Sequence, residues 1–174
     1  AGLLGWQNKR IVLSLYYLGN FQLAAGMERE ALRTYQKIAE LQQNLNAFTA
    51  EEKELNAFYR TLLHYRLSEF TPAKQAFSEI KSLFKANATP STDLKARLQY
   101  IRLLFLATLM ETPSIFTALE KDISVLITTY PNNPEALETQ GLLADLYLQK
   151  GDLERAEKIL LSAHDALEQL PGMN

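Results

Sequence analysis

The side chains that most often perform chemistry in proteins are sparse in this sequence. It contains two histidines, His64 and His164, and no cysteine. Neither histidine belongs to an H-E-x-x-H arrangement or to another spacing that places metal ligands on one helical face. We therefore expect no metal site, with His64 partly buried in a helical hairpin and His164 facing solvent.

The other reactive groups also lack the neighbours that catalysis needs. Serines occur without a glycine-rich nucleophile elbow, and neither G-x-x-x-x-G-K-[ST] nor G-x-G-x-x-G is present. Glu51, Glu52 and Glu54 are close in sequence, but they fall in the first turn of an expected helix, where negative charge complements the helix dipole. We expect no catalytic residue, no cofactor and no enzymatic activity.

Length and charge limit the class of protein further. The 174 residues are 47% hydrophobic, which suffices for one domain or one short helical solenoid. Eighteen Lys and Arg against 20 Asp and Glu give a net charge of −2, so nucleic-acid binding is disfavoured. No apolar run reaches the roughly 18 residues that span a bilayer, so we expect no direct membrane insertion. Without cysteine the compartment stays open, as does the oligomeric state.

The clearest structural pattern is a pair of helices over residues 134–170. Asn133 can cap the first helix and Pro134 can occupy its first position, where a missing N–H has no cost. Gly151 tolerates the left-handed conformation that ends this helix, and Asp152 is a strong N-cap for the next one. Both helices carry apolar residues at helical spacing, so the hairpin has an apolar outer surface that neighbours must cover.

A family resemblance is carried by Leu143-Ala144, Tyr147, Gly151-Asp152, Ala156, Leu160 and Ala163. These residues are similar to the tetratricopeptide repeat (TPR), in which large and small apolar side chains alternate so that two helices interlock. The preceding loop from Tyr130 to Ala136 resembles the linker between consecutive repeats. The resemblance implies an all-α, right-handed α-α superhelix, a TPR-like solenoid, that binds proteins.

Residues 6–46 repeat this pattern near the start of the chain. An apolar helix over residues 6–25 is expected to end at Gly26, and a second begins near Glu28 and extends to about residue 44 or 46. The second helix places Ala31, Tyr35 and Ile38 where Ala156, Leu160 and Ala163 stand later, and Leu18-Gly19 correspond to Leu143-Ala144. Gln22 replaces the tyrosine that the repeat would have.

Residues 49–87 fit the repeat less closely. Thr49 and Glu52 predict a capping box, in which each side chain satisfies the other residue's backbone N–H. The helix that starts there is expected to extend to about residue 69, and Thr71-Pro72 would cap and open the next one. This turn has no glycine, and either Ala73 or Ala76 could be the small interlocking residue.

Residues 92–130 form the remaining predicted hairpin. A loop over residues 87–92 precedes an apolar helix from Leu94 to Met110, and Thr112-Pro113 repeat the cap and proline arrangement. The β-branched run at residues 123–129 has strand propensity. The apolar stripe that begins at Phe116 nevertheless keeps a helical period, which favours a helix.

The sequence therefore predicts about eight helices in four antiparallel hairpins of a single helical-repeat domain spanning residues 1–174. The predicted turns, near Gly26, Pro72, Pro113 and Gly151, are 46, 41 and 38 residues apart, against about 34 in a standard TPR. The longer spacing resembles divergent repeats in effector-sensing regions of transcriptional regulators and in assembly scaffolds. An up-and-down helical bundle is the structural alternative.

In TPR-like stacks the first helix of each hairpin lines a concave groove. The predicted groove residues are Leu13, Tyr16, Asn20 and Leu23 in the first hairpin, Leu55, Phe58, Leu62, Tyr65 and Arg66 in the second, Ile101, Leu104 and Thr108 in the third, and Glu138, Asp145, Leu148 and Gln149 in the fourth. Much of this surface is apolar, so a partner helix, an extended peptide or the chain's own helices must cover it.

These features together predict a non-enzymatic protein-protein interaction scaffold or adaptor that holds a partner helix or peptide in the groove. Tyr16, Phe58 and Tyr65 would anchor the partner, while Asn20 and Arg66 would orient its polar groups. The paired basic and amide side chains that clamp a C-terminal carboxylate are missing. The alternative is an effector-sensing helical-repeat domain of a larger transcriptional regulator.

Overall fold

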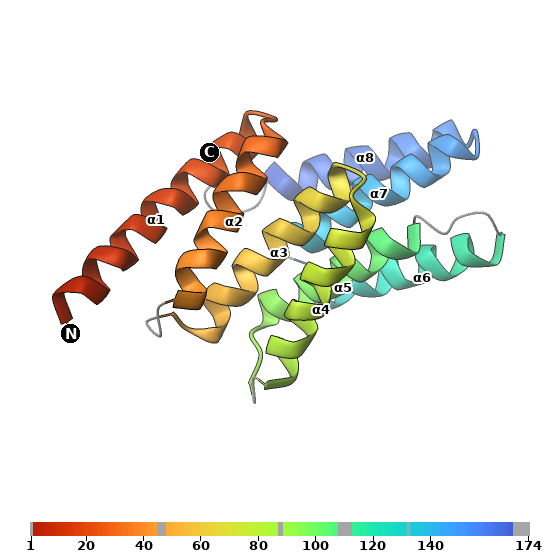
Figure 1. The fold of residues 1–174 in the computed structure, drawn as a ribbon. Helices are drawn as coiled ribbons and strands as arrows, with labels where there is room; N and C mark the ends of the chain where they lie inside the picture. Colours follow the sequence, from red (N-terminus) through yellow and green to blue (C-terminus); the bar gives the residue numbers. More distant parts are fainter. Residues whose placement is uncertain (1, 45–47, 87–88, 108–112, 132, 169–174) are drawn as a thin grey trace. The chain divides into compact units, whose positions relative to one another are not determined.

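The computed structural model describes the whole chain except residues 1, 45–47, 87–88, 108–112, 132 and 169–174. The described residues form eight α-helices and no strand (Figure 1). The helices are α1 (Gly2–Ala24), α2 (Glu28–Asn44), α3 (Ala50–Arg66), α4 (Phe70–Ala86), α5 (Thr92–Ala107), α6 (Pro113–Thr129), α7 (Pro134–Gln149) and α8 (Leu153–Glu168). The predicted all-α class and the number of helices are confirmed for this part of the chain.

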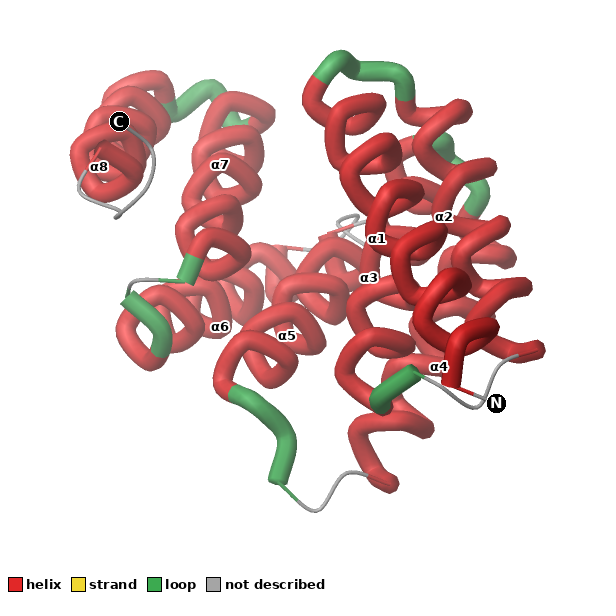
Figure 2. Tube along the Cα trace, turned by 90° about the vertical axis from the view of Figure 1, so that its left-hand side faces the viewer, coloured by secondary structure: helices red, strands yellow, loops and turns green. Residues whose placement is uncertain are grey.

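The chain divides into two compact units, residues 1–90 with α1–α4 and residues 91–174 with α5–α8. Within each unit every helix packs on the next one along the chain, and α5 also contacts α7. Three residues join α1 to α2, α3 to α4 and α7 to α8, and the last of these loops is drawn in green in the tube view (Figure 2). This order of contacts fits a helical repeat, whereas the single-domain organisation stays a prediction.

Three hairpin turns close in the same way, although one of them lacks glycine. Gly26 and Gly151 have φ angles of 71° and 78°, and Ser68 takes the equivalent place between α3 and α4 with φ of 60°. In each turn this residue donates its N–H to the carbonyl three residues earlier, and the next N–H donates to the carbonyl five residues earlier. The paired bonds satisfy carbonyls that the end of the helix leaves open.

Three of the predicted helix starts are confirmed. Thr49 and Glu52 form the reciprocal capping box, with bonds of 3.2 and 2.7 Å. The side chain of Asn133 accepts from the N–H three residues on, with Pro134 in the first helical position. Asp152 accepts in the same way at 3.2 Å. Local side-chain chemistry therefore determines where α3, α7 and α8 begin.

The predicted start of α4 is wrong by two residues. The helix begins at Phe70, so Thr71 and Pro72 lie inside its first turn, and the Ala73 N–H donates to the Glu69 carbonyl. The left-handed residue at 68 ends α3 early and leaves Glu69 as the residue before the helix. The structure does not choose between Ala73 and Ala76, because both are buried. Met110 and Thr112 lie outside the described residues.

The β-branched run at the end of α6 is helical, as the apolar period predicted. Ser124, Thr128 and Thr129 each donate a hydroxyl hydrogen bond to the carbonyl four residues earlier, at 2.7 to 2.8 Å. Ile123 and Leu126 on the other face are fully buried. Tertiary burial and local hydroxyl bonds outweigh strand propensity here.

The first unit is held together by a core that joins α1, α2 and α3. Its buried members are Val12, Ala31, Leu32, Tyr35, Ile38 and Leu63. A buried polar contact crosses the same boundary, because the Asn56 amide of α3 donates to the Tyr35 carbonyl of α2 at 2.8 Å. This bond fixes α3 against α2, the helix on which α1 also packs.

Candidate functional site

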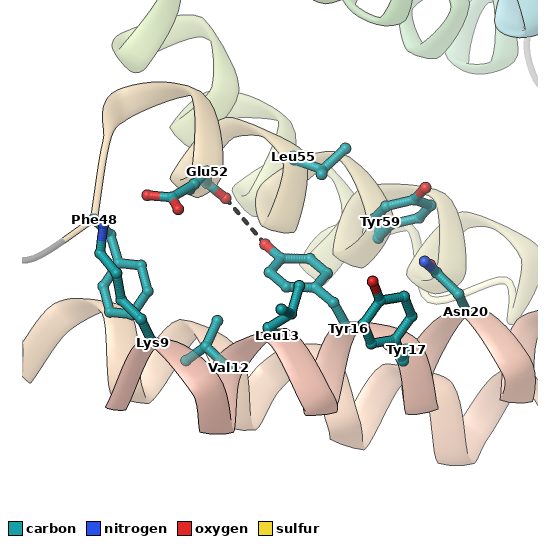
Figure 3. Close-up of a pocket in the computed structure, with 10 residues that line it drawn as sticks. All are labelled: Lys9, Val12, Leu13, Tyr16, Tyr17, Asn20, Phe48, Glu52, Leu55 and Tyr59. Atoms are coloured by element: carbon teal, nitrogen blue, oxygen red, sulfur yellow. Dashed lines mark hydrogen bonds between the residues drawn. The ribbon is translucent and has the colours of Figure 1, made fainter. Parts of the chain in front are cut away.

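A cleft of about 300 Å³ lies between α1 and α3 (Figure 3). Its lining is mostly apolar and aromatic, and it comprises Lys9, Val12, Leu13, Tyr16, Tyr17 and Asn20 from α1, Phe48 from the preceding loop of α3, and Glu52, Leu55 and Tyr59 from α3. The two helices α1 and α3 are the first helices of two consecutive hairpins, and the predicted groove residues of these hairpins lie on them.

Tyr16 bridges the two walls of the cleft. Its hydroxyl donates to the Glu52 carbonyl at 3.0 Å, drawn as the dashed line in Figure 3. The Gln42 amide of α2 donates to the same carbonyl at 3.2 Å and to the Tyr16 hydroxyl at 3.4 Å. Burial raises the pKa of Tyr16 to about 12, so the phenol remains a neutral donor at physiological pH.

Beneath the cleft, Tyr35 of α2 fills the space between α1 and α3. Its fully buried ring stacks on Tyr59 with 4.7 Å between centroids, and Tyr16 meets it edge-on at 5.9 Å. The Tyr35 hydroxyl donates to the Asn20 side chain at 2.6 Å. A Cβ at Gly19 would lie 3.0 Å from this ring, so α1 needs glycine at this position to lie so close to Tyr35.

The open side of the cleft presents large side chains to solvent. Leu13 is 54% exposed and Tyr17 is 69% exposed, although both are apolar or aromatic. Lys9 lies at one end of the cleft and Asn20 at the other (Figure 3). The Glu52 carboxylate is already bonded to the Thr49 N–H in the capping box. The cleft therefore suits an apolar group with polar atoms at its ends.

The predicted groove residues of the first unit fall into two sets. Tyr16 and Asn20 meet in the cleft, whereas Leu23 packs, partly buried, against the core. Phe58 and Leu62 are only 3% and 5% exposed, so they lie below the surface rather than on it.

Two further predicted residues lie at the other end of α3. Tyr65 packs edge-on against Phe70, with 5.8 Å between the ring centroids. Arg66 lies 3.9 Å from the Glu28 carboxylate. Both therefore contribute to the hairpin ends of the first unit and do not line the cleft.

In the second unit Ile101 and Leu104 are buried in the core, so their placement on a groove surface is wrong. Thr108 lies outside the described residues, and the exposed members of the predicted set are Glu138, Asp145, Leu148 and Gln149. The cleft is also lined by four residues that the sequence did not predict: Lys9, Tyr17, Phe48 and Tyr59. Tyr17 could have been found, because it stands four residues after Leu13 and three before Asn20 on one helical face.

The histidines occupy the environments expected for them. The His64 Nδ1 atom lies 2.7 Å from the Glu69 carboxylate, which also accepts from Arg29 at 3.1 Å. The hydrogen bond with His64, together with the nearby Arg29 guanidinium, lowers the pKa of Glu69. His64 is 12% exposed and His164 is 68% exposed. These contacts link α2 to the α3–α4 turn and have a structural role.

Within the described ranges, no cluster of three or more acidic or histidine side chains is arranged to hold a metal ion. No described helix is both long enough and apolar enough to cross a bilayer. Comparison with known proteins gives no match to a family model, a curated protein or a solved structure.

Proposed function

We propose that this chain is a non-enzymatic protein-interaction scaffold or adaptor, in which the α1–α3 cleft receives an apolar side chain of a partner helix or peptide. The observation that carries the proposal is the exposure of Leu13 and Tyr17 beside an apolar recess. Exposed aromatic and aliphatic groups around a recess are the usual composition of an interface hot spot. The polar Asn20 and Lys9 at its ends would align the partner's backbone or polar groups.

The finer architecture is part of the same proposal. The four hairpins would follow one another as a right-handed TPR-like superhelix. The shared turn closure at Gly26, Ser68 and Gly151 supports a common repeated unit. The small residues Gly19 and Ala144 at corresponding helix positions support the interlocking arrangement.

The proposal is tested by selecting linear peptides from a phage-displayed random library on the immobilised chain. Leu13→Glu and Tyr17→Glu place charge on the open side of the cleft without touching the core, so we expect each to weaken the selected peptides at least tenfold. Leu153→Glu, at a 67% exposed position on α8, is the matched control. Equal binding by all four proteins in fluorescence polarisation would reject the cleft as the binding site.

A small-molecule effector is the second candidate occupant, because about 300 Å³ is at the lower end of ligand-pocket volumes. If the chain is a sensor domain, we expect a metabolite from a thermal-shift panel to raise the melting temperature of the native chain. The same metabolite should not raise the melting temperature of Leu13→Trp, because the larger tryptophan ring fills the recess. A peptide that binds the cleft while no metabolite gives this difference would favour the scaffold.

A further inference from the structure

Three polar groups from three different helices meet between the walls of the cleft. The Tyr16 hydroxyl of α1 and the Gln42 amide of α2 both donate to the Glu52 carbonyl of α3, at 3.0 and 3.2 Å. The same amide lies 3.4 Å from the Tyr16 hydroxyl, and we call these contacts together the polar bridge. Gln42 is 3% exposed and is not among the residues that line the cleft. Its place in the polar bridge is therefore separate from any contact with an occupant.

The polar bridge joins two helices whose backbones stay apart. Within the described part of the chain, no Cα atom of α1 lies within 8 Å of one in α3. Apolar contacts between such walls are non-directional, so they tolerate small changes in separation. A hydrogen bond, by contrast, is strong only at donor–acceptor distances of about 2.5 to 3.2 Å. The polar bridge is thus a contact that depends sharply on the distance between the walls.

Burial of the Gln42 amide makes this contact hard to replace. The Tyr16 hydroxyl has one proton to donate and uses it on the Glu52 carbonyl, while the amide supplies the second donor. An amide that donates to a phenol oxygen also polarises the phenol O–H and strengthens the bond that it makes. Loss of either donor leaves the other groups partly unsatisfied, and a water that enters between them would add about 2 to 3 Å to their separation.

We propose that Gln42 is a positioning residue, which through the polar bridge sets the width of the cleft and thereby the size of the partner side chain that the cleft prefers. The inference rests on the proposed function, because size preference requires that the cleft receives such a side chain. When the polar bridge is lost, α1 and α3 can move apart. A wider cleft favours a larger side chain and packs loosely around a smaller one.

The size preference is measured with the tightest peptide from the phage-displayed library, synthesised with leucine or tryptophan at its anchor. The anchor is the peptide residue whose change to alanine weakens binding most. Gln42→Met removes both N–H donors at nearly constant side-chain length, and Tyr16→Phe removes only the hydroxyl. In each variant we expect the affinity for the tryptophan peptide, relative to the leucine peptide, to rise about tenfold or more in fluorescence polarisation.

A purely structural role of Gln42 predicts a different result, because general destabilisation lowers the affinity for both peptides by the same factor. Gln140→Met, at a buried glutamine of α7 in the second unit, is the matched control and should leave the affinity ratio unchanged. Gln42→Met and Tyr16→Phe combined should shift the ratio no further than either alone, since both break the polar bridge. An unchanged ratio in both single variants would overturn the proposal.

The width itself is measured without a peptide, because the chain has no cysteine of its own and accepts spin labels at chosen positions. Leu13→Cys and Leu55→Cys place one label on each wall of the cleft. We expect the distance between the labels in double electron–electron resonance to increase by about 2 to 3 Å in Gln42→Met and in Tyr16→Phe, but not in Gln140→Met. The same distance in all four backgrounds would also overturn the proposal.

The two measurements separate this inference from the proposed function. Peptide binding that Leu13→Glu weakens, with no change of ratio or distance in Gln42→Met, would reject the role of Gln42 and retain the cleft as the binding site. A label distance that increases in Gln42→Met, with peptide binding that Leu13→Glu leaves intact, would reject the cleft as the binding site and with it the size preference.

Discussion

The first helices of successive hairpins meet differently in the two units. In the second unit, Arg97 donates to Glu135 at 2.7 Å and Asn133 donates to Asp93 at 3.2 Å, and α5 approaches α7 to Cα–Cα distances within 8 Å. In the first unit, no described α1–α3 pair of Cα atoms is that close. The walls are instead linked through the Tyr16 hydroxyl, and the cleft lies between them.

The side chains beneath each pair of helices also differ. In the first unit the filling group is the ring of Tyr35 on α2, with Tyr59 of α3 stacked on it. In the second unit α6 contributes Leu119, Ile123 and Leu126 to the core, and its ring Phe116 packs edge-on against Tyr147 of α7. The stacked pair fills the space under the cleft, so the position of the cleft depends on Tyr35, a residue of the second helix that does not line it.

The largest loss of stability is expected from Gly19→Ala, because the added methyl group occupies space that the Tyr35 ring needs. The added methyl group would sit 3.0 to 3.3 Å from two ring carbons and the hydroxyl oxygen of Tyr35, so we expect a loss of about 2 to 3 kcal/mol in the free energy of unfolding, measured in urea. Tyr35→Leu imitates the last hairpin, where Leu160 accompanies Ala144.

A double-mutant cycle between Gly19→Ala and Tyr35→Leu separates this clash from other effects. We expect a favourable coupling of about 1 kcal/mol or more, because the smaller side chain removes the contact. Additive losses would show that Gly19 does not accommodate the ring.

Asn133→Ala should weaken the closed pair of helices in the second unit. The substitution removes the N-cap of α7 and the bond to Asp93, so we expect a loss of about 2 kcal/mol. Amide hydrogen exchange should accelerate in α5 and α7 and stay unchanged in α1 and α3. Equal acceleration of exchange in all four helices would contradict the expectation that the substitution destabilises the second unit alone.

Glu54→Gln should stabilise the first unit at neutral pH. The Glu54 side chain of α3 is 2% exposed and neither carboxylate oxygen has a hydrogen-bond partner among the described residues. Burial, followed by the charge of Glu51, raises the pKa of this carboxyl. The neutral amide avoids a buried charge, so we expect a gain of about 1 to 2 kcal/mol at pH 7.

The pH dependence provides the control for this substitution. With its folded pKa above the unfolded one, Glu54 binds more protons in the folded state between these two values, so its cost grows as pH rises through that window. Below the unfolded pKa both states are protonated and the advantage of Glu54→Gln should vanish. Urea titrations at pH 7 and pH 4 that give the same difference would exclude an ionised carboxylate as the cause.

The smallest effect is expected at the turn without glycine. Ser68→Gly should raise the free energy of unfolding by about 0.5 to 1 kcal/mol, since the left-handed conformation is easier for glycine. The reverse change, Gly26→Ser, should cost a similar amount in thermal unfolding. No change at Ser68 would indicate that its side chain compensates for the backbone conformation.

Local chemistry made much of the fold predictable from sequence. The capping box at Thr49, the cap at Asn133 and the glycine turns each depend on residues within one turn of helix. The start of α4 was missed because a left-handed serine gives almost no signal, whereas Thr71-Pro72 gives a strong one. Local signals of this kind identify helix ends well only where the special residue is glycine or a capping side chain.

The site was only partly predictable, for a different reason. The register of the TPR-like repeat placed Tyr16 and Asn20 on the face of α1 that lines the cleft. It placed Phe58 on the surface too, although the structure buries it, because the register does not say which faces another helix will cover. The width of the cleft depends on Tyr35, which is remote in sequence from both walls and reaches them only through tertiary packing.

The three packed tyrosines Tyr16, Tyr35 and Tyr59 also give the protein an intrinsic optical signal. Rings at 4.7 and 5.9 Å, held in fixed relative orientations by packing, form a rigid chiral array of chromophores. Such arrays contribute to near-ultraviolet circular dichroism, which depends on tertiary packing. Because Tyr16 and Tyr59 also line the cleft, an occupant changes the surroundings of the array directly. Loading of the cleft can therefore be followed by absorption of polarised light, without a label.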